Sequence, residues 1–233
     1  MLPIPAYINT IFILTTIGTL IWTIVGMLQS PNASTKKAAN IAALLLLMWC
    51  IFQSTLALNK WYIDRIGTPP HLTFALAGPL VVFGLLMLIP STRKILYGLS
   101  LFHLTAIHTV RIPVEITLWL LYLHQQVPVS MTFEGFNFDI IMGLTAPIVC
   151  YVIYRNKSKR NLLLAWNILG LCLLGIIVST AIGAAPTSVQ WRDFSYPNYA
   201  VIHFPFIWLP SFIVPVVLIS HVLSIRKLIQ NED

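Results

Sequence analysis

Charged residues are scarce in this chain. Only 9% of its 233 residues are Asp, Glu, Lys or Arg, whereas 58% are hydrophobic. A soluble domain has about a quarter of its residues charged, so a chain of this composition cannot cover a water-facing surface. The scarcity excludes an ordinary soluble fold and predicts a protein of the lipid bilayer, in agreement with the mean hydropathy of +0.83.

The sequence also lacks the short motifs of several function classes. It contains no GxGxxG, P-loop, HExxH or GxSxG motif, so nothing in it predicts a nucleotide, zinc-protease or α/β-hydrolase site. Its three cysteines have no CxxC spacing and lie in apolar segments, at Cys50, Cys150 and Cys172. We therefore expect buried free thiols rather than disulfides or a metal framework.

Seven long apolar stretches are present instead. A helix needs about 20 apolar residues to cross the hydrocarbon core, and unpaired backbone amides are too costly in lipid for irregular structure. The expected spans are residues 6–28, 38–59, 71–89, 95–124, 138–154, 162–183 and 203–225. We therefore expect an all-α, polytopic membrane protein whose residues 1–233 form a single seven-transmembrane-helix bundle.

The basic residues alternate between the connections. Ten of the fourteen lysines and arginines lie in the connections and tail on one side, three lie on the other side, and Arg111 lies within a span. The positive-inside rule then predicts an N-terminus outside and a C-terminus in the cytoplasm, in a plasma membrane or a bacterial inner membrane. Because these charges sit at segment ends, we expect the lipid bilayer and no nucleic acid as a partner.

Three ionisable residues lie close together in the fourth stretch. At about 100° per residue, His108, Arg111 and Glu115 share one face of a helix. Charges at this depth are costly and almost always point into the bundle. Arg111 and Glu115 are one turn apart and are expected to pair. The cluster is either a structural ion pair that locks the bundle or a site for a ligand, an ion or a proton.

Other polar residues are candidates for the same interior. Gln53 lies in the second stretch, Asn167 in the sixth, and Asp139 at the start of the fifth. Hydrogen bonds between helices would explain each of them equally well. We include them with the cluster as the expected ligand-binding residues.

The six histidines raise the question of a metal or haem. His71, His124 and His203 fall at the outer ends of their spans, where with Asp139 they are candidate zinc ligands. Either His103 or His108 is a candidate axial ligand of haem iron. Their spacing along the chain does not show that they converge, so the cofactor stays unknown, with zinc and haem as the alternatives.

The sequence therefore predicts a membrane protein that binds a small molecule or ion in an outward-facing polar cavity, as a transporter-like protein or a sensor. Arg111 would hold an anionic group or Glu115, Glu115 would be the counter-ion or proton acceptor, and His108 would tune that pair. The first alternative is a redox protein with haem or metal. The second is an intramembrane enzyme in which His108 and Glu115 act as acid and base, although we expect binding rather than catalysis.

Overall fold

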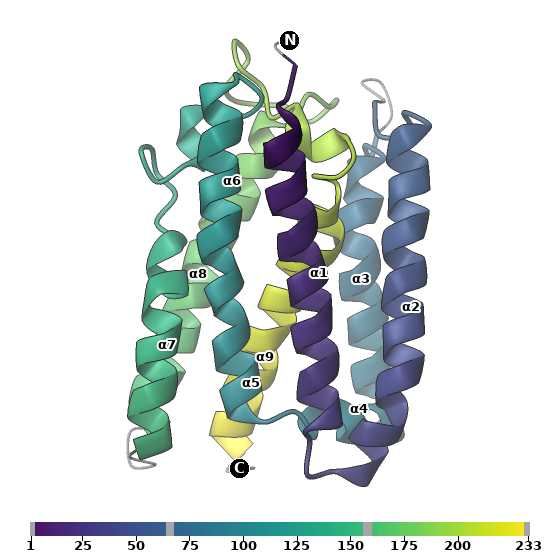
Figure 1. Cartoon of the computed structure of the whole chain (residues 1–233), viewed down its shortest axis with the longest axis vertical. Coiled ribbons are helices and arrows are strands. Elements are labelled where there is room, and N and C mark those ends of the chain that lie inside the picture. Colours follow the sequence, from purple (N-terminus) through teal and green to yellow (C-terminus); the bar gives the residue numbers. More distant parts are fainter. Residues whose placement is uncertain (1–2, 64–67, 156–159, 231–233) are drawn as a thin grey trace.

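The structure, a computed structural model, describes residues 3–63, 68–155 and 160–230, and the regular elements in these ranges are all helices. Figure 1 shows a bundle in which α1 starts at one end, here called the upper end, and the chain finishes at the opposite, lower end. The α-helices are α1 (Ala6–Leu28), α2 (Ala33–Leu58), α3 (Leu72–Leu88), α4 (Pro90–Tyr97), α5 (Leu101–Ala106), α6 (Arg111–Leu123), α7 (Ile140–Arg155), α8 (Arg160–Ala184) and α9 (Val214–Gln230). Short 3-10 or π segments are η1 (Ile107–Val110), η2 (Val129–Met131), η4 (Ala200–Ile202) and η5 (Leu209–Ile213).

Within the described residues, five helical segments are long and apolar enough to cross a membrane, or six if the bent pair α3 and α4 is one span. They are Ala6–Leu28, Ala33–Leu58, Leu101–Leu123, Arg160–Ala184 and Leu209–Gln230. Large apolar side chains such as Leu14 and Leu45 are about 60% exposed on their outer faces, whereas His108 and Asn167 are fully buried. Apolar residues outside and polar residues inside are the distribution of a protein whose surroundings are lipid.

The chain bends by 108° between α3 and α4. The helix expected over residues 95–124 is wrong at its start, because α4 ends at Tyr97 and α5 begins only at Leu101. Ile89 has an extended backbone and Pro90 begins a new helix, a position where its missing N–H needs no partner. The side chain of Ser100 then accepts a hydrogen bond from the backbone N–H of His103 and caps α5. As a result α4 lies across the lower end of the bundle (Figure 1).

Helix α7 is short for a membrane span. Its 16 residues make about 24 Å of helix, against a hydrocarbon core of about 30 Å. Figure 1 shows α7 in the lower part of the bundle, with the preceding loop descending to it from the upper end. Helix length therefore does not establish the span expected over 138–154, and the count of seven spans stays a prediction.

The last span begins with the π-helical turn η5. Pro215 has no N–H to donate to the carbonyl of Ser211, four residues earlier. The indole Nε1 of Trp49 on α2 donates to that carbonyl instead, at 2.8 Å. The helical segment runs from Leu209 to Gln230, so it lies further along the chain than the expected 203–225.

Helix α9 lies in the interior of the bundle, close to the buried polar residues. It contacts α3, α4, α5, α8 and η1. Its buried side chains include polar ones, among them His221, Ser224 and Lys227. The polar interior is therefore arranged around α9 and the opposing span formed by α5, η1 and α6.

Candidate functional site

Arg111 is the central residue of the buried polar interior. It begins α6, about half-way along the span Leu101–Leu123, and is 2% exposed. Its Nη1 forms an ion pair with Oδ1 of Asp139, and its Nη2 lies 2.9 Å from Nε2 of His221 on α9. The expected Arg111–Glu115 pair is wrong, because among the described residues the acid within ion-pair distance of Arg111 is Asp139.

A close contact between α6 and α7 explains this choice of partner. A Cβ at Gly143 would lie 2.9 Å from Cγ1 of Ile112 and 3.2 Å from Cβ of Arg111. A larger side chain would therefore push the two helices apart. Gly143 follows Asp139 by about one helical turn, so the same contact brings the carboxylate of Asp139 to the guanidinium.

Glu115 has a neutral partner. Its Oε1 accepts a hydrogen bond from Nδ2 of Asn137, which also donates to the carbonyl of Met131 at 3.0 Å. The Oδ1 of Asn137 accepts from the backbone N–H of Asp139 at 3.0 Å. Asn137 therefore positions both acids, and Oε2 of Glu115 is left without a hydrogen-bond partner among the described residues.

The hydrogen bonds of His221 assign its tautomer. Nδ2 of Asn167 donates to the carbonyl of Leu163 at 2.8 Å, and Oδ1 of Asn167 lies 2.8 Å from Nδ1 of His221. An amide oxygen only accepts, so Nδ1 carries the proton and Nε2 of the neutral ring accepts from Arg111. The position of the ring depends on Gly170, where a Cβ would lie 2.6 Å from Nε2 of His221.

His108 stacks on His221. The two rings are 3.9 Å apart between centroids and 24° from parallel, and Trp166 meets His108 edge-on at 5.3 Å. His108 is fully buried, and neither ring nitrogen has a hydrogen-bond partner within the described part of the chain. We call His108, Arg111, Asp139, Asn167 and His221 the polar layer.

A cavity of about 150 Å³ lies on the upper side of the polar layer. Its walls come mainly from α3, α6, α8 and η5 and are apolar apart from Thr73, Thr187 and the two acids Glu115 and Asp139. This upper cavity is therefore an apolar space with two carboxyl groups on its wall.

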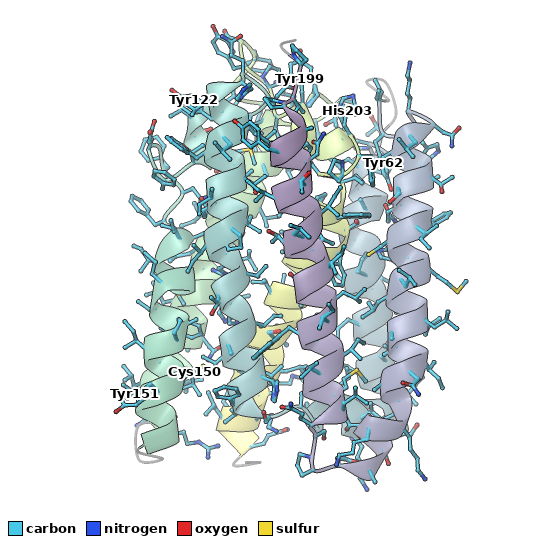
Figure 2. All side chains as sticks on the ribbon, viewed as in Figure 1. Tyr62, Tyr122, Cys150, Tyr151, Tyr199 and His203 are labelled. Atoms are coloured by element: carbon cyan, nitrogen blue, oxygen red, sulfur yellow. The ribbon has the colours of Figure 1, made fainter. Side chains whose placement is uncertain are left out.

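A second cavity, of about 860 Å³, lies at the lower end. Figure 2 labels one of its wall residues, Cys150, low in the bundle. Five basic residues line it, and the wall contains no Asp or Glu of the described chain; the basic residues are Arg93, Lys94, Arg160, Arg226 and Lys227. Thr105, one turn before His108, lies on the wall nearest the polar layer, so the two cavities lie on opposite sides of that layer.

The structure brings together some of the predicted site residues and leaves others apart. His108, Arg111, Asp139 and Asn167 meet in the polar layer, and Glu115 lies beside it. Gln53 is fully buried but accepts a hydrogen bond from the hydroxyl of Tyr62, whose pKa is raised by burial. It has no hydrogen bond to the polar layer.

The three histidines considered as zinc ligands make separate local contacts. Nδ1 of His71 lies 2.8 Å from the carbonyl of Trp61, and Nδ1 of His203 lies 2.8 Å from that of Tyr199, near the upper end in Figure 2. Nδ1 of His124 lies 2.9 Å from the carbonyl of Leu120. Within residues 3–63, 68–155 and 160–230, no three His, Cys, Asp or Glu residues are placed to hold a metal ion.

The residues named for the haem and enzyme alternatives lie in separate surroundings. Neither His103 nor His108 lines either cavity. His103 instead packs against Trp22, with ring centroids 5.4 Å apart. His108 and Glu115 have separate partners, His221 and Asn137.

Two residues of the interior are missed by the sequence analysis. His221 is expected near the membrane interface, because Arg226 and Lys227 follow it closely. Helix α9 continues beyond these charges to Gln230, and Nζ of Lys227 donates to the carbonyls of Tyr97 and Leu99 at 3.0 and 2.9 Å. Asn137 precedes its span and carries no charge, so no sequence signal distinguishes it.

Apolar helices that enclose a layer of charged and polar side chains define the class of this chain, a polytopic integral membrane protein. The chain belongs to the family described as domain of unknown function DUF8737, whose model matches residues 69–229. The match extends from the start of α3 through α9 and includes the whole polar layer. No curated protein and no solved structure matched the chain.

Proposed function

We propose that this protein binds a small, mostly apolar molecule with a cationic or hydrogen-bond-donating group in the upper cavity, as a transporter-like protein or a sensor. The observation that carries the proposal is Glu115, an acid on an apolar cavity wall whose Oε2 has no partner among the described residues. A buried acceptor without a partner costs about 1–3 kcal/mol. A donor on a bound molecule would remove that cost.

The charges near the upper cavity favour a cation. Arg111 offsets Asp139, whereas the partner of Glu115 is the neutral amide of Asn137. With all three groups ionised the set has one excess negative charge. A ligand with one positive charge would balance it in surroundings where unpaired charge is expensive.

The size and walls of the upper cavity limit the ligand. A volume of about 150 Å³ corresponds to about five water molecules in the liquid. Its remaining walls are apolar, so a short alkyl body would fit better than a second polar group. Primary alkylammonium ions therefore have the required chemistry, and the second cavity across the polar layer supports a transporter-like role.

A thermal-shift titration of the purified full chain in neutral detergent tests the proposal. Propylammonium and butylammonium should raise the melting temperature by mass action, and propanol and butanol should not. Glu115→Gln keeps an oxygen for Asn137 but removes the charge, so it should abolish the ammonium effect.

The matched control for this titration is Glu134→Gln. Glu134 accepts a hydrogen bond from Trp119 and does not line the upper cavity, so this variant should respond like the parent protein. Equal stabilisation by the alcohols, or equal loss in the control, would reject the upper cavity as a cation site.

The proposed topology is seven crossings with the upper end outside. In this arrangement α7 and the loop before it together form the fifth crossing, and the lower end with its basic side chains lies in the cytoplasm. Arg65, Lys157 and Lys159 enter the charge count but lie outside the described residues.

A further inference from the structure

The lower cavity owes its shape to the way α4 is held across the end of the bundle. Thr35 of α2 donates to the carbonyl of Ile95 at 2.8 Å, and Ser30 donates to that of Gly98 at 2.6 Å. Asn32 donates to the carbonyl of Lys94 at 3.3 Å. Side chains of the connection between α1 and α2 and of the first turn of α2 thus fix α4, and the basic residues it carries, over the cavity.

Basic residues from three helices line this space. Arg93 and Lys94 come from α4, Arg160 from α8, and Arg226 and Lys227 from α9. Lys227 is 6% exposed, because the carbonyls between α4 and α5 hold its amine in the wall. A concave surface lined by one sign of charge concentrates ions of the opposite sign.

Thr105 adds an independent observation. Several helical threonines of this chain, such as Thr16 and Thr117, donate to the carbonyl four residues earlier. Thr105 is 1% exposed, and its hydroxyl has no partner in the described ranges. It lies on the cavity wall, so a buried hydroxyl is available to a bound group at the inner end of a basic space.

We propose that the lower cavity is an anion site for a phosphate group, contributed by a lipid headgroup or by a free phosphate compound. Guanidinium groups pair with phosphate oxygens through two parallel hydrogen bonds, and basic pockets between membrane helices suit phosphorylated headgroups. The hydroxyl of Thr105 would donate to a phosphate oxygen. The site is independent of the function proposed for the upper cavity.

Calorimetric titration of the purified full chain in neutral detergent tests the anion site. One arm uses inorganic pyrophosphate. The other compares dihexanoyl phosphatidylglycerol with dihexanoyl phosphatidylcholine, which has the same chains but no net charge. Saturable binding of pyrophosphate indicates a free phosphate compound, and saturable binding of the anionic lipid alone indicates a headgroup.

Two double variants locate the binding. Arg93→Gln with Arg226→Gln removes two exposed charges of the cavity wall and should weaken binding at least about tenfold. Lys36→Gln with Lys37→Gln removes two charges at the same end but outside the wall, and should leave affinity within about twofold. Absence of saturable binding in both arms, or equal losses in the two double variants, would overturn the proposal.

Discussion

The two cavities differ in how their charges are accommodated. Beside the upper cavity, Arg111 and Asp139 lie at depth and are paired, because an unpaired charge there is costly. Around the lower cavity, Arg93 and Arg226 are exposed at helix ends, where long basic side chains reach water. Burial therefore determines whether these charges have fixed partners, and this holds at the lower end too, where the buried amine of Lys227 is held by two carbonyls.

We expect the largest effect from removing one member of the buried ion pair between Arg111 and Asp139. Arg111→Met leaves Asp139 buried without a counter-charge, which typically costs about 3–5 kcal/mol. We expect a large fall in melting temperature, and a substantial recovery when Asp139→Asn is added. Thermal unfolding of the single and double variants measures both effects, and strictly additive losses would show that the two residues do not interact.

A second prediction concerns the packing that positions His221. In Gly170→Ala the new methyl group would approach Nε2 of His221 to 2.6 Å, so the ring must move from Arg111 at a cost of about 1–3 kcal/mol. Gly175→Ala is the matched control on the same helix, because a Cβ there has no neighbour among the described atoms within 4 Å. It should be neutral or stabilising by up to about 1 kcal/mol. Equal melting temperatures of the two variants would show that the tight contact at Gly170 does not fix the position of His221.

The threonines of one span provide a smaller test of the difference between the cavities. Thr117 donates to the carbonyl of Pro113 at 2.7 Å, so Thr117→Val should cost about 0.6 kcal/mol, as membrane hydrogen bonds do on average. Thr105→Val loses no hydrogen bond to the protein and should leave the stability of the ligand-free chain unchanged or slightly higher. A greater loss at Thr105 than at Thr117 would show that its hydroxyl is already satisfied.

A fourth prediction concerns which end of the bundle faces the outside of the cell. It is tested by thiol labelling, and we expect no change in stability. Tyr196→Cys places an exposed thiol at the upper end and Lys37→Cys places one at the lower end. An impermeant thiol reagent added to intact cells should label the first variant and not the second. The reverse pattern would invert the proposed topology and put the lower cavity outside.

The sequence pattern correctly predicts the buried polar region but gives the wrong ionic partner for Arg111. His108, Arg111 and Glu115 were expected to face the interior, and all three are at most 2% exposed. Asp139 was included as a candidate, yet its pairing with Arg111 depends on the close approach of α7 at Gly143. That approach joins positions 28 residues apart, and helical periodicity carries no information about it.

The helix boundaries, too, could be predicted from the sequence only in part. Apolar runs indicated where the long helices lie, and Pro90 and Ser100 are recognisable as helix-starting residues. The separate helix α4 was missed because residues 95–124 read as one continuous helix, whereas the chain breaks between Tyr97 and Leu101. His221 was missed because α9 extends past its basic residues, with Lys227 held by carbonyls of another segment.

The membrane class, the helical fold and the inward direction of the deep charges can be predicted from the amino-acid sequence alone. Each of these follows from the free energy of single residues or short segments in lipid, whatever their neighbours. The pairing of Arg111 with Asp139 and the positioning of Glu115 by Asn137 are features of the folded chain that the sequence does not predict. The same is true of the two cavities of different charge on opposite sides of one layer. These features depend on which helices approach each other and how closely, and that is set by packing between residues far apart in the chain.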